Sequence, residues 1–288
     1  MKFCLFIFVT LLAFTGFSQT KKEKGTYFLN VGASNFLGDL GGANQIGTNG
    51  LKDLELVLTR PAISGGYRYF LNNSNIIKGG LTYLRVNGDD KLTTEYFRNF
   101  RNLKFRSPIL ELSAIYEFYL LTESSGHLYK LKRAKGKKAQ SWNIYVFGGI
   151  AGFWYNPKGP LNGRWYALRK LQTEGVRYSS INIAIPFGMG VKKTISRKIA
   201  LHFEINMRKT FTDYIDDVST VYYDYNSMLA EKGPIAAYFS DPGGQGKSYQ
   251  TATGLQRGDP KDKDAYMTIQ FGISYKINRM RGIFQSKF

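Results

Sequence analysis

Residues 264–278 read Asp-Ala-Tyr-Met-Thr-Ile-Gln-Phe-Gly-Ile-Ser-Tyr-Lys-Ile-Asn. From Ala265 to Ile277 every second side chain is apolar, and those between are mostly polar or small. This alternation predicts a β-strand with one apolar face. The stretch exceeds the roughly 9 to 11 residues that a tilted strand needs to cross a bilayer, and Lys276 lies on its polar face. One face for lipid and one for an enclosed lumen are typical of a membrane-spanning β-barrel.

The N-terminus has the pattern of an export signal. Lys2 precedes an almost wholly apolar run over residues 3–14, and the small residues Gly16 and Ser18 follow at the positions that a signal peptidase reads. The run is shorter than a transmembrane helix. We therefore expect residues 1–18 to be a cleaved signal peptide for export to the outer membrane. Cys4, the only cysteine, leaves with it, so the mature chain has no disulfide and no cysteine-based metal site.

Composition and charge narrow the class of protein. Aromatic residues make up 15% of the chain, which also has 31 glycines, as suits antiparallel strands with tight bends. The formal net charge is +19 at pH 7. A basic surface can bind nucleic acid, but an exported chain meets anionic lipid headgroups or acidic protein partners instead. We expect outer-membrane lipids as partners and no nucleic acid.

Seven further segments alternate with a period of two and predict strands at residues 27–33, 62–71, 76–86, 107–121, 142–155, 181–191 and 199–207. With residues 264–278 they make eight. The predicted fold is all-β: a single eight-stranded antiparallel transmembrane β-barrel with long external loops, covering residues 19–288. A strand within residues 51–60 stays open, because its leucines extend the pattern across Pro61.

The links between the predicted strands alternate in length. Short links at 72–75 and 194–198 alternate with long ones at 34–61, 87–106, 156–180 and 212–263, as periplasmic turns and external loops do. The link at 122–141 is the exception, because it is long on the periplasmic side. It carries a cluster of cations: Lys130, Lys132, Arg133, Lys135, Lys137 and Lys138. We interpret this cluster as a candidate partner contact, and a solvated loop is the alternative.

Charged and polar residues recur on the predicted inner face of the barrel: Glu111, Glu117, Lys192, His202, Glu204, Arg208 and Lys276. Eight strands leave an interior just wide enough for side chains. We therefore expect a salt-bridged plug, which argues against an open pore. His202 beside Glu204 suits a hydrolase, but no serine stands out as a partner, so we predict no catalytic residues and no cofactor.

An acidic motif follows the strand at 199–207 and consists of Asp213, Tyr214, Asp216 and Asp217. Its oxygens suit calcium, but the spacing does not match an EF-hand loop, so we interpret it as a solvated acidic loop without metal. The glycines of residues 241–246 lack the helix that a phosphate loop requires and indicate a flexible connector.

A short helix is expected in the third external loop. Trp165, Leu168 and Leu171 have helical spacing there. Packing over the barrel mouth is the simplest role for such a helix.

Several segments together resemble the PorG-like family of outer-membrane barrels of the type IX secretion system. They are Asn-Phe-Leu-Gly-Asp-Leu at 35–40, Asn156-Pro157 with Trp165 and Leu168, Thr-Glu-Gly at 173–175, Ile-Pro-Phe-Gly at 185–188, and Thr-Asp-Tyr-Ile-Asp-Asp-Val-Ser at 212–219 followed by Tyr222 and Asp224. The resemblance covers nearly all of the mature chain. The motif at 212–219 is the most specific of these segments.

The resemblance implies an outer-membrane barrel that contacts a periplasmic ring, built from a PorK-like lipoprotein and a PorN-like partner. It also implies a role in protein transport by that machinery and, in some bacteria, in gliding motility. Other outer-membrane proteins of the secretion system are further possible partners. The family has no enzymatic residues to carry over. On position and charge, and not on a family motif, residues 130–138 are the expected ring-facing element.

Two rival interpretations remain at this stage. The same barrel can instead be a small outer-membrane channel, or a barrel for hydrophobic compounds, unrelated to secretion. A soluble lipocalin-like barrel requires the apolar face to point inward, with Lys276, Arg208 and Glu204 outside in water.

Overall fold

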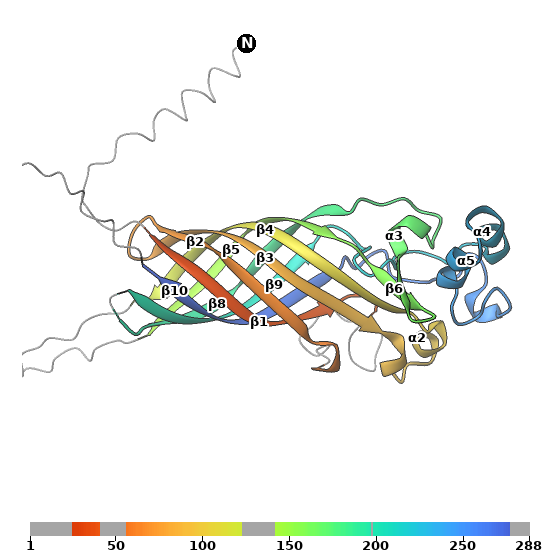
Figure 1. Cartoon of the computed structure of the whole chain (residues 1–288), viewed down its shortest axis with the longest axis horizontal. Helices are drawn as coiled ribbons and strands as arrows, with labels where there is room; N and C mark the ends of the chain where they lie inside the picture. The colour runs from red at the N-terminus through yellow and green to blue at the C-terminus, as the bar shows by residue number, and fades with distance from the viewer. Residues whose placement is uncertain (1–24, 41–55, 123–141, 197, 277–288) are drawn as a thin grey trace, which may run out of the picture.

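The computed structural model describes residues 25–40, 56–122, 142–196 and 198–276. Eight long strands close into an antiparallel barrel, in which each strand pairs with its neighbours along the chain and the last pairs with the first (Figure 1). These strands are β1 (Gly25–Leu37), β2 (Arg60–Phe70), β3 (Asn75–Asp89), β4 (Lys104–Leu121), β5 (Asn143–Tyr155), β8 (Ile181–Thr194), β9 (Ile199–Thr210) and β10 (Ala265–Tyr275). The predicted fold class is confirmed.

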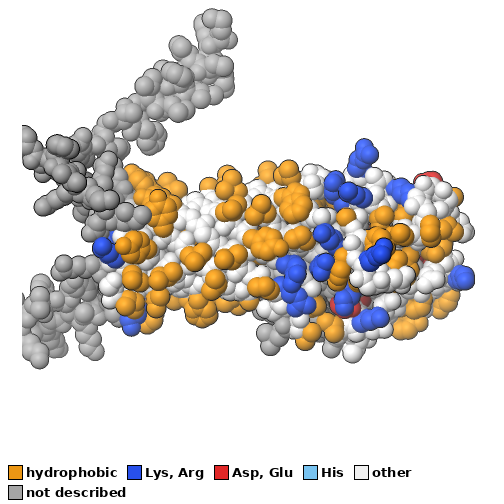
Figure 2. Space-filling model, in the orientation of Figure 1, with side chains coloured by type: hydrophobic (Ala, Val, Ile, Leu, Met, Phe, Trp, Pro, Cys, Tyr) orange, Lys and Arg blue, Asp and Glu red, His pale blue; other side chains and the backbone are white. Residues whose placement is uncertain are grey.

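Apolar side chains cover the outside of the barrel wall. Leu29, Leu81, Leu112, Ile183 and Phe271 are all more than half exposed. Figure 2 shows apolar side chains along the barrel, with most of the Lys and Arg side chains gathered toward the loop end. The intervening polar residues point inward and are buried. An apolar exterior around a polar interior suits lipid, so the soluble barrel with an inward apolar face is wrong.

Several strands continue beyond the apolar pattern at the loop end. β4 begins at Lys104, three residues before the predicted start, and β3 ends at Asp89, three residues after the predicted end. The added residues keep the antiparallel ladder, with Asp89 opposite Lys104. Phe105, an inward side chain among the added residues, is buried against the loops. These strands therefore continue past the region where apolar side chains alternate toward lipid, because the loops pack against their inner face.

The external loops fold into a cap over the barrel mouth (Figure 1). Its elements are η2 (Leu56–Leu58), η3 (Asp90–Leu92), α2 (Tyr96–Arg101), β6 (Lys158–Leu161), β7 (Arg164–Ala167), α3 (Leu168–Leu171), α4 (Tyr225–Lys232), α5 (Pro234–Ser240) and η4 (Tyr249–Thr251). One apolar cluster joins cap and barrel, and it includes Phe36, Phe105, Leu168, Ile215 and Phe239. Among the residues that the structure describes, no helix is long and apolar enough to cross a membrane.

One local expectation needs correction, and one alternative that the sequence left open is answered for part of its range. The helix in the third loop spans only Leu168–Leu171, and Trp165 lies instead on β7, which pairs with β6 as a short hairpin. In the described part of residues 51–60, Leu56–Leu58 form a 3-10 turn and β2 starts at Arg60. The signal peptide at 1–18 and the basic segment at 130–138 lie outside the described residues.

The exposed apolar wall predicts that a charge placed on its outer face destabilises the barrel more near the middle of the bilayer than near the bilayer surface. Leu112 is 68% exposed near the middle of the outward face of β4. We expect Leu112→Arg to lower the free energy of unfolding in lipid vesicles by about 2 to 4 kcal/mol, because the guanidinium enters hydrocarbon. Thr122→Arg, just past the end of β4, serves as the control and costs at most about 1 kcal/mol. An equal cost at both positions in urea titrations contradicts the lipid-facing assignment.

Candidate functional site

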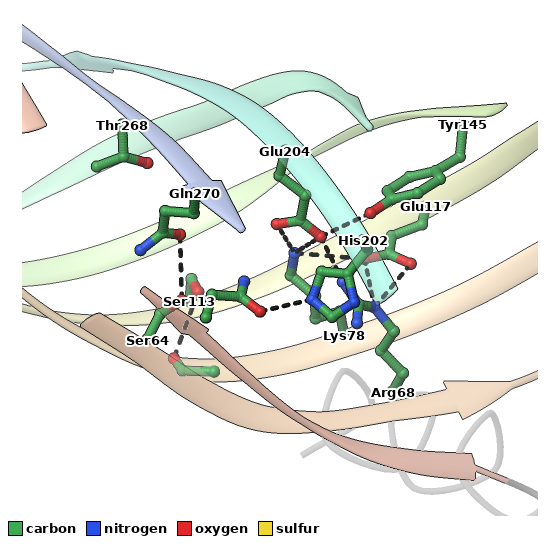
Figure 3. A network of polar contacts seen from close by, with 12 residues as sticks. Ser64, Arg68, Lys78, Ser113, Glu117, Tyr145, His202, Glu204, Thr268 and Gln270 are labelled. Carbon is green, nitrogen blue, oxygen red and sulfur yellow. Dashed lines mark hydrogen bonds and ion pairs between the residues drawn. The ribbon is translucent and has the colours of Figure 1, made fainter. Parts of the chain in front are cut away.

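Four buried charges meet in the lumen and form what we call the lumen plug. They are Arg68 of β2, Lys78 of β3, Glu117 of β4 and Glu204 of β9, and Figure 3 shows them pointing toward one another. Arg68 Nε lies 3.0 Å from Glu117 Oε1, and Lys78 Nζ lies 2.8 Å from Glu204 Oε2. Lys78 also contacts Glu117 at 3.3 Å, and Arg68 also pairs with Glu204. Each cation therefore contacts both carboxylates.

Strand register brings these charges together. Arg68 and Lys78 are direct partners across β2 and β3, so the two cations lie side by side. Like charges placed opposite each other in a sheet repel. Glu117 and Glu204 offset that repulsion from neighbouring and opposite parts of the wall. The plug is thus balanced, with two positive and two negative groups.

Neutral polar groups surround the plug. Tyr145 donates a hydrogen bond from its hydroxyl to Glu204 Oε1 at 2.8 Å. His202 contacts Asn30 Oδ1 through Nε2 at 2.5 Å, and Ser274 Oγ through Nδ1 at 3.2 Å. Ser274 also accepts a hydrogen bond from Arg68. Since Ser274 and His202 are buried at 1% and 4% exposure, their contact stiffens the plug and offers no accessible nucleophile.

A second charged layer crosses the lumen nearer the cap. Arg208 Nε lies 2.6 Å from Glu111 Oε2, and Tyr266 donates to the same oxygen at 2.7 Å. Arg208 also donates to Thr268 Oγ1 at 2.8 Å. These side chains come from β4, β9 and β10 and are all buried. The lumen is therefore filled at two levels by paired charges.

The sequence predicted the carboxylates of the lumen, but it missed two of the cations that pair with them. Glu111, Glu117, His202, Glu204 and Arg208 all lie inside the barrel. Lys192 also lies on the inner face, with its ammonium over the rings of Phe70 and Tyr119 at 5.4 and 5.9 Å. Lys276 lies just past the end of β10.

Sequence reasoning missed two residues that matter most in the plug. Arg68 was on the polar face of its predicted strand and Lys78 within the next strand, but neither was assigned to the network. The available signal was charge balance, since buried carboxylates require partners.

The acidic motif after β9 is buried, so its interpretation as a solvated loop is wrong. Asp213, Asp216 and Asp217 are 1 to 2% exposed. Asp216 accepts hydrogen bonds from the backbone N–H of Leu40 at 3.1 Å and of Val218 at 3.0 Å. These aspartates satisfy loop N–H and O–H groups inside the cap, where water does not reach.

The other members of the motif also hold loops together. Asp217 accepts hydrogen bonds from the hydroxyls of Thr173, at 2.6 Å, and Tyr178. Tyr214 stacks on Tyr178 with ring centroids 4.4 Å apart and donates to Glu174. Among the described residues no group of three or more His, Cys, Asp or Glu is arranged to hold a metal ion.

Two buried arginines link distant cap loops, and sequence reasoning missed both. Arg257 pairs with Glu174 at 2.8 Å and donates to the carbonyl oxygens of Asp217 and Phe239. Arg101 pairs with Asp90 at 2.8 Å and donates to the carbonyl oxygens of Asp39 and Arg257. Contacts this far apart in the chain leave no local sequence signal.

The glycine-rich stretch at 241–246 is ordered and not a flexible connector. Asp241 accepts hydrogen bonds from the backbone N–H of Gly244 at 2.9 Å and of Gly246 at 2.8 Å. Its side chain also accepts from Thr251 at 2.9 Å. One carboxylate thus organises the whole turn.

Fold and site together define a transmembrane β-barrel with a charge-filled lumen and a packed external cap. The chain belongs to the family described as "Domain of unknown function (DUF6089)", which matches residues 2–231. A comparison with curated proteins finds no match.

Several solved outer-membrane proteins have a similar shape at low sequence identity. Ail of Yersinia pestis, in complex with sucrose octasulfate, is 10% identical with a TM-score of 0.39, covering 88% of this chain and 97% of Ail. Neisserial surface protein A is 9% identical with a TM-score of 0.37, covering 87% and 97%. OprG from Pseudomonas aeruginosa is 10% identical with a TM-score of 0.36, covering 88% and 98%. No function is transferred from these proteins.

The lumen plug predicts that removing one of its charges strongly lowers the stability of the barrel. We expect Glu204→Gln to lower the free energy of unfolding by about 3 to 5 kcal/mol, because Arg68 and Lys78 are left partly uncompensated in a buried site. Lys104→Gln, which breaks an exposed ion pair with Asp89, costs about 1 kcal/mol or less.

Denaturant titration in lipid vesicles measures both variants. Adding Lys78→Met to Glu204→Gln restores charge balance, so the double variant should be more stable than Glu204→Gln alone. Equal losses for Glu204→Gln and Lys104→Gln would refute the role of the plug.

Burial of the acidic motif predicts a pH-dependent cap. Burial raises the pKa of Asp213 to about 7, despite hydrogen bonding from Ser219, and raises the pKa of Asp217 to about 6. The folded cap therefore binds protons more tightly than the unfolded loops, so its stability falls as pH rises from about 4 to about 7.

Hydrogen exchange of residues 212–264 should be slower at pH 5.5 than at pH 8. Asp213→Asn removes part of that difference, whereas Asp224→Asn, at the N-cap of α4, preserves it. Exchange that slows with rising pH, after correction for the intrinsic rate, contradicts the assignment.

Proposed function

We propose that the chain is a non-enzymatic outer-membrane barrel that anchors or contacts components of the type IX protein secretion machinery. In this proposal it is exported by a cleaved signal peptide and meets a periplasmic ring of PorK-like and PorN-like proteins. The proposal rests on the segments that resemble the PorG-like family, among them Asn35 to Leu40 and Thr212 to Ser219. A contribution to gliding motility belongs to the same proposal.

The observation that favours an anchor over a channel is the charge-balanced lumen plug. Arg68, Lys78, Glu117 and Glu204 fill the lumen, and Arg208 with Glu111 crosses it again nearer the cap. A solute would have to separate buried ion pairs at both levels, which costs several kcal/mol. A barrel whose lumen carries no solute is suited to act by contact between its surface and other proteins.

The expected periplasmic contact is the basic segment from Lys130 to Lys138. In the sequence this segment belongs to the link between β4 and β5, and β4 ends and β5 begins at the end of the barrel opposite the cap. Six cations there suit an acidic protein surface. Charge complementarity of this kind raises association rates and makes binding sensitive to salt.

The experiment is a mild-detergent pull-down of the tagged barrel from native outer membranes. We expect the intact barrel to recover the two ring proteins and a variant lacking residues 130–138 to lose at least 80% of them. Lys261→Gln with Lys263→Gln removes charge at the cap end and serves as the matched control, with recovery unchanged. Failure of the intact barrel to recover the ring contradicts the secretion role.

A conductance measurement in planar bilayers separates the anchor from the channel alternative. The intact barrel should conduct almost no current. Steady single-channel currents from the intact barrel, together with no ring in the pull-down, would support the small-channel reading instead.

A further inference from the structure

Three cations stand together on the outside of the barrel where the apolar wall ends. Arg85 follows Leu81 and Tyr83 on the outward face of β3, and those two side chains are 52% and 51% exposed. Arg106 lies on the outward face of β4, diagonal to Arg85 across the strand pair. Lys158, the first residue of β6, is the direct strand partner of Arg106. Figure 2 shows Lys and Arg side chains gathered at this boundary between the wall and the cap.

These cations, which we call the rim cluster, have no carboxylate partner among the described residues. Arg85 and Arg106 are close enough to repel each other, and Arg85 Nε is buried without a hydrogen-bond partner. Asp89, two outward positions further along β3, is held by Lys104 at 2.6 Å. Three like charges without a counterion raise the free energy of the site unless an anion binds there.

A tryptophan orients one of the cations. The guanidinium carbon of Arg106 lies 3.8 Å from the ring centroid of Trp165, which β7 brings over the wall. Stacking on the indole holds the flat face of the guanidinium and leaves its N–H edge available. Tryptophan is also the side chain that favours the level of lipid headgroups.

The chemistry of the rim cluster selects a phosphate. Arginine binds phosphate oxygens through two parallel N–H donors, and lysine adds a point charge. The wall beside the cluster is apolar, because Leu110 and Leu112 follow Arg106 on the outward face of β4 and are 42% and 68% exposed. A ligand that uses both surfaces is an amphiphile with a phosphorylated headgroup.

We propose that Arg85, Arg106 and Lys158 bind the phosphorylated headgroup of an outer-leaflet lipid, whose acyl chains pack along β3 and β4. The lipid supplies the counterion that the described protein lacks. This binding stands independently of any role in secretion, because it uses the outer wall and neither the lumen nor the periplasmic segment. A bound lipid there also covers the junction between the barrel and the β6–β7 hairpin.

The test measures lipid retention by the purified mature chain in a neutral detergent, by native mass spectrometry. The probes are diphosphorylated lipid A, the same lipid with both phosphates removed, and inorganic phosphate as a competitor. We expect at least tenfold tighter binding of the diphosphorylated form. Arg85→Gln with Arg106→Gln should weaken that binding at least tenfold, whereas inorganic phosphate at the same concentration should not displace the lipid.

Matched variants distinguish a specific binding site from attraction of the lipid to any positive charge on the barrel. Lys193→Gln with Lys198→Gln removes the same charge at the opposite end of the barrel and should leave binding within twofold. Arg85→Lys with Arg106→Lys keeps the charge but loses the paired donors, and should bind with intermediate affinity. Heat-modifiable migration on gels confirms that each variant is folded.

Three outcomes overturn the proposal. One is unchanged lipid A binding by the folded Arg85→Gln, Arg106→Gln variant. Another is equal binding of lipid A with and without its phosphates by the unaltered chain, which needs no variant and shows that the wall alone binds. The last is displacement of the lipid by inorganic phosphate at equal concentration, which identifies a free-anion site.

Discussion

Charge balance inside a narrow lumen is the constraint on which this barrel depends. Arg68, Lys78, Glu117 and Glu204 come from four different strands, and each is surrounded by protein. A buried charge without a partner costs several kcal/mol, so the four tolerate one another only in this arrangement. A slip of one residue in any of these strands would turn a charge toward lipid. The same pairs that close the lumen therefore also select the strand register.

Much of the barrel could be predicted from alternation alone, because side-chain direction in a strand repeats every two residues. That rule placed Glu117 and Glu204 inside from their immediate neighbours. It could not identify Lys78 as their partner, since pairing depends on register across separate strands. The β6–β7 hairpin was missed because strands of four residues are too short to show a period.

The structure of the cap is the part that could least be predicted from neighbouring residues in the sequence. Asp213, Asp216 and Asp217 look like a solvated loop because acidic clusters usually are, and only packing against distant segments buries them. Leu40 and Asp216 are 176 positions apart in the chain, yet their contact helps to close the loops. Such contacts carry no signature within a window of neighbouring residues.

Among the described residues, more carboxylates than cations are buried. Ten carboxylates among the described residues are buried: Asp90, Glu111, Glu117, Glu174, Glu204, Asp213, Asp216, Asp217, Asp241 and Asp264. Five cations are buried with them, namely Arg68, Lys78, Arg101, Arg208 and Arg257, whereas others such as Lys104 are exposed. The surface is therefore more positive than the overall composition suggests, which favours contact with anionic lipids and acidic partners.

The length of β4 has a consequence for where the cap stands. Its 18 residues span about 60 Å at roughly 3.3 Å per residue, or about 46 Å along the barrel axis at a tilt near 40°. The apolar band of such barrels is only about 25 Å tall. The wall therefore extends beyond the hydrocarbon by about 20 Å in total, and at the loop end it carries Arg106 and the β6–β7 hairpin past the apolar band. A partner that binds the cap therefore does so outside the hydrocarbon of the bilayer.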